Sequence, residues 1–312
     1  MAGAPERDDL RVTVGIVTRN RPASLRRCVE SVARLGELVE DVVIVDDTSD
    51  PPARESLGQL PPALADRTRF VRQDANEGYI VARNATVRTA RTEYVILMDD
   101  DACFLDAGSI RAIVDLMQRD PRVAAVACAM AEGDGSPWDA RMQASPVSYP
   151  CYVPSFIGFA HLLRRRVFLE LGGYRESFRF YGEEKDYCRR LLAARYDVVY
   201  APSARVAHFP DPSGRNQARY LRYVVRNDCL CALYNDPFPL VCATVVLRLA
   251  AYFAMRRGWH IDDPGGFLWV LRELAAQVPA VLRGRTPMTL SDLRRWRDLR
   301  RVWPPYRAPV TA

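Results

Sequence analysis

Short runs of apolar, largely β-branched residues alternate with longer segments whose apolar positions recur at helical spacing. Continuous apolar runs are typical of parallel strands buried on both faces, and the longer segments are typical of amphipathic helices. The predicted strands are residues 12–17, 41–46, 69–72, 93–98 and 123–130, and the predicted helices are residues 22–35, 79–91 and 109–119. This alternation predicts an α/β fold with a mostly parallel central sheet flanked by helices.

The pattern changes after the last of these strands. Residues 132–154 are rich in Gly, Pro and Ser, and such a long loop in a compact domain is usually functional or disordered. The elements expected beyond it are two short ones at 156–163 and 166–171, a helix that starts near 181 and a short strand at 198–200. His208 is expected in the loop after that strand, and the chain is predicted to be helical from Arg219 onward.

Polar residues gather where three predicted strands end, at 18–20, 46–49 and 99–101. In open α/β sheets, ligands bind beyond the carboxyl ends of the strands, so we expect these residues to converge. Adjacent carboxylates such as Asp99, Asp100 and Asp101 repel one another and raise each other's pKa. A divalent cation offsets this repulsion, because Mg²⁺ takes oxygen ligands from carboxylates and substrate phosphates. The alternative is a solvated acidic turn, since strand ends collect Asp.

In their order and spacing, residues 12–20, 43–49, 76–84 and 96–101 resemble the successive motifs of family 2 glycosyltransferases. The resemblance covers about residues 10–228. It implies the GT-A type nucleotide-diphospho-sugar transferase fold, with a C-terminal helical extension after it. The family's Asp-x-Asp motif matches Asp99 and Asp101. The resemblance implies that Asp101 binds Mg²⁺ or Mn²⁺, and that Asp99 or Asp100 contacts the ribose or supports the metal.

The same resemblance implies a set of nucleotide-binding residues. Thr18 and Asp47 are expected beside the nucleobase, where a carboxylate accepts a hydrogen bond from N3–H of uracil or thymine, so the expected donor is a UDP- or dTDP-sugar. Alternatively, Asp47 caps a turn. The whole expected set is Thr18, Arg19, Asp47, Asn76, Gly78, Arg83, Asp99, Asp100 and Arg226. Arg83 and Arg226 alternatively belong to solvated cationic helix faces.

Residues 181–186 resemble the family's second motif, in which Gly-Glu-Asp-x-Asp opens a helix beneath the acceptor. Glu184 replaces the middle Asp and is the expected base, with Asp186 and Glu183 as the other catalytic candidates. Acids in a first helical turn also simply complement the helix dipole. His208 matches the position of a metal or diphosphate ligand, so the expected metal set is Asp99, Asp101 and His208. A purely structural histidine is the alternative.

The resemblance implies an inverting transferase that moves the sugar to a hydroxyl or amine. Its acceptor is an unknown small molecule, lipid-linked compound or saccharide of cell-envelope or natural-product biosynthesis. The expected domain is residues 1–218, with a nucleotide-binding half at about 10–130 and an acceptor half at 131–218, followed by the extension at 219–312. One alternative is a sugar nucleotidyltransferase, although residues 18–22 lack the expected glycine-rich loop. Another is a non-catalytic nucleotide-binding protein or an NAD-dependent enzyme, and the absence of G-x-G-x-x-G after a strand counts against a dinucleotide fold.

The composition of the chain limits the classes of partner that we expect. The net charge of +6 comes almost entirely from arginine, which is typical of a GC-rich bacterial genome and suits phosphate or an acidic membrane surface. The arginines are dispersed, so we expect no nucleic-acid partner. The 8 cysteines contain no C-x-x-C pair, which favours reduced, buried thiols. The first residues lack an apolar core, so we expect no signal peptide and a cytoplasmic protein, with peripheral contact to the inner membrane face as an option.

Two apolar segments lie in the extension, at 240–255 and 266–282. The first is interrupted by Arg248 and is too short for a bilayer span, which needs about 20 apolar residues. Together they offer more apolar surface than the surface of a monomer usually exposes. We therefore expect a homodimer interface or a shallow membrane contact.

Overall fold

The computed structural model describes residues 10–210 and 216–309. Its strands are β1 (Val12–Thr18), β2 (Val39–Asp46), β3 (Thr68–Arg72), β4 (Tyr94–Asp99), β5 (Ala102–Phe104), β6 (Val123–Ala131), β7 (Cys151–Tyr152), β8 (Ala160–Arg164) and β9 (Asp197–His208). Its α-helices are α1 (Pro22–Val32), α2 (Ala53–Leu57), α3 (Tyr79–Thr89), α4 (Ala107–Arg119), α5 (Arg165–Glu170), α6 (Glu183–Ala193), α7 (Gln217–Asn235), α8 (Leu240–Gly258), α9 (Gly266–Gly284) and α10 (Leu290–Leu299).

In the described part of the chain, one 9-stranded sheet has the order β3-β2-β1-β4-β8-β6-β9-β5, with β7 paired to β9. Strands β3, β2, β1 and β4 are parallel neighbours. Strand β8 is antiparallel to both β4 and β6, and β9 is parallel to β6, so β6 and β9 run in the direction of β4. The predicted α/β fold with a mostly parallel sheet is confirmed.

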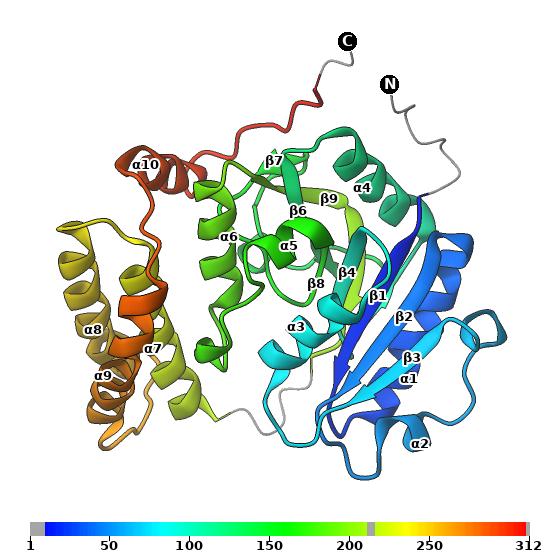
Figure 1. The fold of residues 1–312 in the computed structure, drawn as a ribbon, viewed down its shortest axis with the longest axis horizontal. Coiled ribbons are helices and arrows are strands. Elements are labelled where there is room, and N and C mark those ends of the chain that lie inside the picture. The colour runs from blue at the N-terminus through cyan, green and yellow to red at the C-terminus, as the bar shows by residue number, and fades with distance from the viewer. Residues whose placement is uncertain (1–9, 211–215, 310–312) are drawn as a thin grey trace.

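Helices cover both faces of the sheet (Figure 1). One buried cluster packs α1 and α4 on one face, and a second packs α3, α5, α6 and α7 on the other. Side chains of β4 alternate between them: Ile96 and Met98 belong to the first cluster, Val95 and Leu97 to the second. Neighbouring side chains of a strand point to opposite faces, which is why a continuous apolar run is needed here.

The carboxyl ends of the first strands meet at one edge, as the sequence predicts. Thr18 at the end of β1 is in register with Asp46 of β2, and Val17 is in register with Asp99 of β4. The polar residues that follow each strand therefore start from adjacent positions. This edge is where the candidate active site lies.

Strand β9 is longer than the sequence predicts. Only residues 198–200 were expected as a strand, with His208 in a loop, and that expectation is wrong because β9 continues to His208. Its register with β6 shifts between Cys128 and Ala129, and Ala129 pairs with Arg205. The polar residues and the proline of the shifted segment hide the strand from pattern analysis. Beyond the shift, β9 pairs with β5.

The stretch at 132–154 is ordered. Strand β7 lies in it, and the side chain of Gln143 bonds the backbone of Met130 through both its oxygen (2.9 Å) and its nitrogen (2.8 Å). These bonds fold the stretch back on the end of β6. The thiols also follow the expectation, except that Cys242 is exposed while the other cysteines are buried.

The helical extension is built from α7 to α10, with α7, α8 and α9 standing beside the sheet (Figure 1). Ion pairs tie α10 to the domain, from Arg195 to Asp292 (2.8 Å) and from Arg295 to Asp197. The chain then returns to β7, where Tyr152 N donates to Pro304 O (2.9 Å). In the described residues, no helix is both long and apolar enough to cross a membrane. The extension is helical as predicted, while the boundary at 218 stays a prediction.

Close packing of α3 on β1 gives a test of the fold. A Cβ at Gly15 would lie 2.1 Å from Thr86 Cγ2, so we expect Gly15→Ala to lower the free energy of unfolding by about 1–3 kcal/mol. Thr86→Ser removes that methyl group and should recover part of the loss in the double variant. Urea unfolding measures both. Gly258→Ala is the control, because nothing lies within 4 Å of its Cβ position, and an equal loss there would contradict the argument.

Candidate active site

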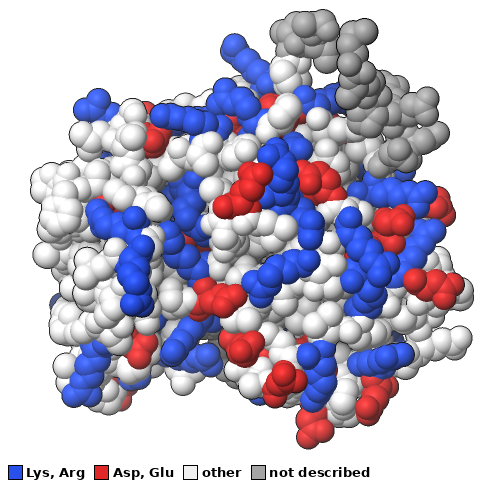
Figure 2. Space-filling model, viewed as in Figure 1, with Lys and Arg blue, Asp and Glu red and all other residues white. Residues whose placement is uncertain are grey.

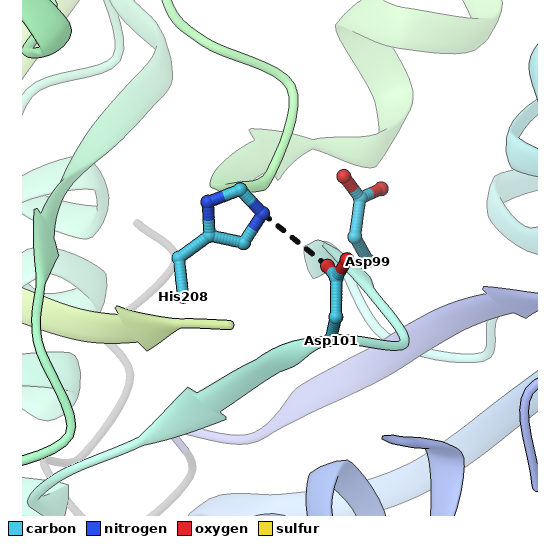
Figure 3. A group of neighbouring side chains, drawn as sticks. All are labelled: Asp99, Asp101 and His208. Atoms are coloured by element: carbon cyan, nitrogen blue, oxygen red, sulfur yellow. Dashed lines mark ion pairs between the residues drawn. The ribbon is translucent and has the colours of Figure 1, made fainter. Parts of the chain in front are cut away.

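Three side chains from strand ends converge in the cluster Asp99, Asp101 and His208 (Figure 3). Asp99 ends β4, and Asp101 lies in the turn before β5. Pairing of β5 with β9 places Ala102 opposite His208, so the imidazole reaches the turn. One ligand atom from each residue lies within 4.8 Å of the others, and His208 Nε2 is 3.3 Å from Asp101 Oδ1. The three residues assigned to the metal are thus brought together.

The cluster fits a divalent cation. Asp101 Oδ1 and His208 Nδ1 are buried without a hydrogen-bond partner among the described residues. Buried polar atoms normally have partners, so an unsatisfied carboxylate oxygen beside an imidazole suggests a missing ligand. Mg²⁺ and Mn²⁺ take carboxylate oxygens, and imidazole is also a ligand of transition metals. The donor set therefore suits Mg²⁺ or Mn²⁺.

Asp100 and Arg21 complete the acidic turn. Thr18 Oγ1 donates to Asp100 Oδ2 (2.7 Å), and Arg21 Nη1 donates to Asp100 Oδ1 (3.2 Å) and Asp101 Oδ2 (3.0 Å). Burial raises the pKa of Asp100 to about 6 against the hydrogen bond from Thr18 and the charge of Arg21. Burial also opposes ionisation of Asp101, but His208 and Arg21 outweigh it and lower its pKa. Sequence analysis missed Arg21, although it directly follows the first polar strand end.

The residues expected around the nucleobase lie in one cluster. Asp47 is buried, and its carboxylate accepts from Glu77 N (3.0 Å) and Gly78 N (3.2 Å). With its amide oxygen and nitrogen exchanged, the orientation that satisfies both atoms, Asn76 donates to Asp47 (3.0 Å) and accepts from Arg19. Gly78 precedes α3 with φ of 90°, a conformation that favours glycine. Asp47 thus organises the turn at 76–78 whether or not it also contacts a base.

Arg83 is buried in the middle of the site. Its guanidinium donates to Asp99 Oδ1 (2.6 Å), Glu183 Oε1 (2.8 Å) and Gly158 O (2.8 Å). Its side chain is 4% exposed, so the alternative of a solvated surface charge is wrong. The physical reason is that α3 lies between the sheet and the start of α6, which the sequence pattern does not reveal. Arg83 therefore links the metal-binding turn to the acids of α6.

The acids that open α6 have different surroundings. Gly182 caps the helix in a left-handed conformation, and Glu183, Glu184 and Asp186 lie in the first turn. Glu183 is fully buried against Arg83, and the Tyr79 hydroxyl donates to it (3.1 Å). Burial and the charge of Glu184 raise the pKa of Glu183 well above its usual range. The first acid of the motif is thus a buried partner of Arg83.

Glu184 remains accessible, with 17% of its side chain exposed and its Oε1 atom 3.6 Å from Arg83 Nη1. Burial raises its pKa, while the charge of Arg83 opposes the rise. Gly158 makes room for it, because a Cβ there would lie 2.1 Å from Glu184 Oε1. Sequence analysis missed Gly158. The only sequence signal was its place between two apolar residues before a strand.

Asp186 points away from solvent into an ionic network. It is fully buried and accepts from Arg190 Nε (2.9 Å) and Asn235 Nδ2 (2.8 Å), and Arg175 lies 3.5 Å away. Asn235 ends α7, so Asp186 fastens α6 to the helical extension. Among the three acids of the motif, only Glu184 keeps a partly open carboxylate.

The side chain of Arg226 bonds residues outside the acidic cluster. The side chain is fully buried in α7, where Nη1 donates to Ser177 O (3.0 Å) and Nε lies 3.4 Å from Glu273 of α9. The alternative of a solvated cationic face is therefore wrong. Within the described residues, Arg226 forms no hydrogen bond or ion pair with Asp99 or Asp101. The expected contact with the diphosphate stays a prediction.

Comparison with known proteins shows to which family the chain is similar. The sequence model of "Glycosyl transferase family 2" matches residues 13–195, more than half of the 312-residue chain. An uncharacterized glycosyltransferase of Bacillus subtilis is 26% identical over 223 residues, which are 67% of this chain and 78% of that protein. An N-acetylglucosaminyl-diphospho-decaprenol L-rhamnosyltransferase of Mycobacterium tuberculosis is 26% identical over 247 residues, covering 66% of this chain and 78% of the relative.

A solved structure shares the fold. The mannosyltransferase of Pyrobaculum calidifontis, determined in complex with GDP-Man and Mn²⁺, superposes with a TM-score of 0.56. The two chains are 18% identical in sequence, and the superposition covers 91% of this chain and 77% of the mannosyltransferase chain. At this identity, the likeness supports the architecture alone.

The position of Arg83 predicts a large effect of its removal. Arg83→Met leaves Glu183 buried without its cationic partner, so the free energy of unfolding should fall by about 3–5 kcal/mol. Arg83→Met/Glu183→Gln should recover part of that loss, because the fully buried carboxylate of Glu183 is then removed, while Asp99 and Glu184 keep some access to solvent. Denaturant unfolding at neutral pH measures the series.

The matched control lies on the same helix. Arg88 has a side chain that is 56% exposed and 3.7 Å from Glu176, so Arg88→Met should change stability by about 1 kcal/mol or less. Equal losses at positions 83 and 88, or no recovery in the double variant, would show that the buried ion pair is not what holds this region.

Proposed function

The chain belongs to glycosyl transferase family 2 and is a glycosyltransferase of GT-A fold, and we propose that it inverts the anomeric carbon of a UDP- or dTDP-sugar. The observation that carries the proposal is the meeting of two groups of acids at Arg83. On one side lie Asp99 and the metal-binding turn, and on the other lies Glu184. This arrangement supports a mechanism in which the leaving group and the base lie on either side of one buried guanidinium. The alternatives of a nucleotidyltransferase and a non-catalytic protein do not agree with the family.

The donor base is the first part of the proposal. An ionised carboxylate has about four acceptor positions. Glu77 N, Gly78 N and the Asn76 amide use three of them at Asp47, which leaves one for N3–H of uracil or thymine. Thr18 is the last residue of β1, and Arg19 follows it directly. We assign these residues to the nucleoside and the neighbouring Asp99 and Asp100 to the ribose side of the donor.

Asp99, Asp101 and His208 would hold Mg²⁺ or Mn²⁺. When bound, such an ion neutralises charge on a departing diphosphate. The P. calidifontis mannosyltransferase structure contains Mn²⁺, which supports this assignment. Arg21 fixes the orientation of Asp100 and Asp101 through its two hydrogen bonds. Asp101 is therefore aligned by Arg21, while Thr18 orients the neighbouring Asp100.

Glu184 is the proposed base. Its carboxylate is the accessible one of the motif, and burial makes it a stronger base by raising its pKa. As Glu184 takes the proton of the acceptor hydroxyl or amine, the acceptor atom bonds to the anomeric carbon on the face opposite the diphosphate, and the bond from that carbon to the nucleoside diphosphate breaks, so the configuration is inverted in one step. A retaining covalent route needs a carboxylate nucleophile close to that carbon. Glu183 and Asp186 are occupied by arginines, so we assign them structural roles.

The names of the relatives support a proposal for the class of acceptor. The mycobacterial rhamnosyltransferase acts, by its name, on a saccharide attached to diphospho-decaprenol. This supports a lipid-linked or saccharide acceptor and a place in cell-envelope or natural-product biosynthesis. The ordered stretch at 132–154 is the proposed acceptor side, because Gln143 holds it against the end of β6.

The metal assignment predicts a binding defect that needs no turnover. Asp101→Asn should weaken Mn²⁺ binding by about tenfold or more and make UDP binding independent of Mn²⁺. Isothermal titration of UDP with and without Mn²⁺ measures both effects. Asp115→Asn on α4 is the control, and it should keep the Mn²⁺ dependence. An Asp101→Asn variant with unchanged Mn²⁺ dependence would rule out this ligand set.

The base assignment predicts a defect in turnover. Glu184→Gln should keep UDP binding and lower nucleoside diphosphate release from a donor panel by a factor on the order of 10² to 10⁴. Glu170→Gln on α5 is an exposed control and should stay fully active. Proton NMR of the product should show an anomeric configuration opposite to that of the donor.

Two results would contradict this mechanism. Retention of configuration would exclude direct displacement. A stable, inactive Asp186→Asn variant beside an active Glu184→Gln variant would move the base to Asp186, against the burial of that carboxylate.

A further inference from the structure

The helices α8 and α9 both expose large apolar side chains, which together are here called the α8–α9 face. On α9 these side chains recur at intervals of three, seven and four residues and so lie on one side of the helix, and on α8 the seven-residue spacing of Val246 and Phe253 places these two on one side. The side chains of the face are Val246, Leu247 and Phe253 on α8, and Leu268, Leu271, Val278 and Leu282 on α9, each between 38% and 75% exposed. Both helices pack against α7, and the rings of Phe253 and Phe267 join them at 4.7 Å. Soluble monomers rarely expose so many large apolar side chains together.

The charges around this face are mostly positive. Helix α8 contains no acidic residue and ends in Arg256 and Arg257, and α9 has Arg283 in its last turn. The acid of α9, Glu273, lies 3.4 Å from buried Arg226. Figure 2 shows mainly white and blue surface where Figure 1 places α8 and α9. The exposed Asp262 lies just beyond α8 and pairs with Arg256 at 3.8 Å.

We propose that the α8–α9 face docks on a lipid bilayer that contains anionic lipids. Apolar side chains on one side of a helix, flanked by arginines, are the composition of helices that lie in a membrane interface. Each arginine near an anionic surface adds to the binding. A second copy of the chain is the weaker occupant, because a two-fold interface would bring these arginines near their own copies.

A row of aromatic rings connects this face with the active site. Tyr181, just before α6, contacts Tyr220 of α7 (4.8 Å between ring centroids), and Tyr220 stacks on Trp259 at the end of α8 (5.8 Å). All three rings are between 38% and 43% exposed. Tyrosine and tryptophan combine an apolar ring with a polar tip, which suits the boundary of a membrane. The row therefore leads from the docked face to the first turn of α6, where Glu184 lies.

This path indicates the class of acceptor. If Glu184 is the base of the proposed function, an acceptor anchored by a lipid in the same bilayer would reach it along the aromatic row. The acceptor class rests on the proposed function, whereas docking rests only on the α8–α9 face.

Vesicle flotation of the full chain tests the docking. We expect the protein to float with vesicles of phosphatidylcholine and phosphatidylglycerol, less with phosphatidylcholine alone, and less at high salt. Leu247→Gln/Leu282→Gln changes side chains that are 69% and 75% exposed, and it should weaken binding by about tenfold. Arg257→Gln/Arg283→Gln should remove the preference for phosphatidylglycerol.

The control double variant is Leu169→Gln/Val302→Gln, which changes exposed apolar side chains outside the face. It should bind vesicles like the unaltered chain. No flotation of the unaltered chain, equal losses in the test and control variants, or a dimer in light scattering that Leu247→Gln/Leu282→Gln dissociates would each overturn the docking.

Titration of UDP with Mn²⁺ on the same samples separates the two proposals. The leucine and arginine variants should bind the nucleotide like the unaltered chain, since they lie outside the site. Flotation without any Mn²⁺-dependent nucleotide binding would overturn the proposed function and leave the docking intact.

Discussion

The guanidinium of Arg83 joins the end of β4 to the start of α6, which lies 100 residues beyond Arg83 in the chain. It lies between Asp99 at the end of β4 and Glu183 at the start of α6, and it also bonds the carbonyl of Gly158. Burying several carboxylates without a cation is strongly unfavourable, so the acids of both parts depend on this arginine. The metal-binding turn and the proposed base therefore keep a common geometry because they share one partner.

The change of strand direction at β8 brings His208 to the acidic turn at residues 99–101. After the parallel strands β3, β2, β1 and β4, the antiparallel β8 lets β6 and β9 join the same sheet. The end of β9 then pairs with β5, directly after the Asp99–Asp101 turn. His208 and Asp101 are neighbours for this reason, although more than 100 residues separate them in sequence. Backbone pairing, rather than a flexible loop, thus positions the imidazole.

The first helix of the C-terminal extension, α7, also holds the start of α6 in place. Asn235 of α7 bonds Asp186, and Asn227 of α7 donates to three carbonyls just before α6, those of Phe178, Phe180 and Tyr181. The start of α6 is therefore held by α3 on one side and by α7 on the other. An apolar face on α8 and α9 then lies on elements that are rigidly connected to the acids, so docking at this face would orient the active site relative to the surface.

The sequence by itself determined the alternation of the first strands and helices, the edge where their polar residues gather and the three acids of the turn at 99–101. Those features follow from local periodicity and from residues adjacent in the chain, and the family resemblance assigned the metal ligands. Only the tertiary structure decided that Arg83 is buried, that Glu184 rather than Asp186 stays accessible, and that β9 extends to His208. Burial and ionic partners depend on packing between distant segments, and the shifted register of β9 has no apolar pattern. A charged residue on a helix looks the same in sequence whether its partner is water or a carboxylate a hundred residues away.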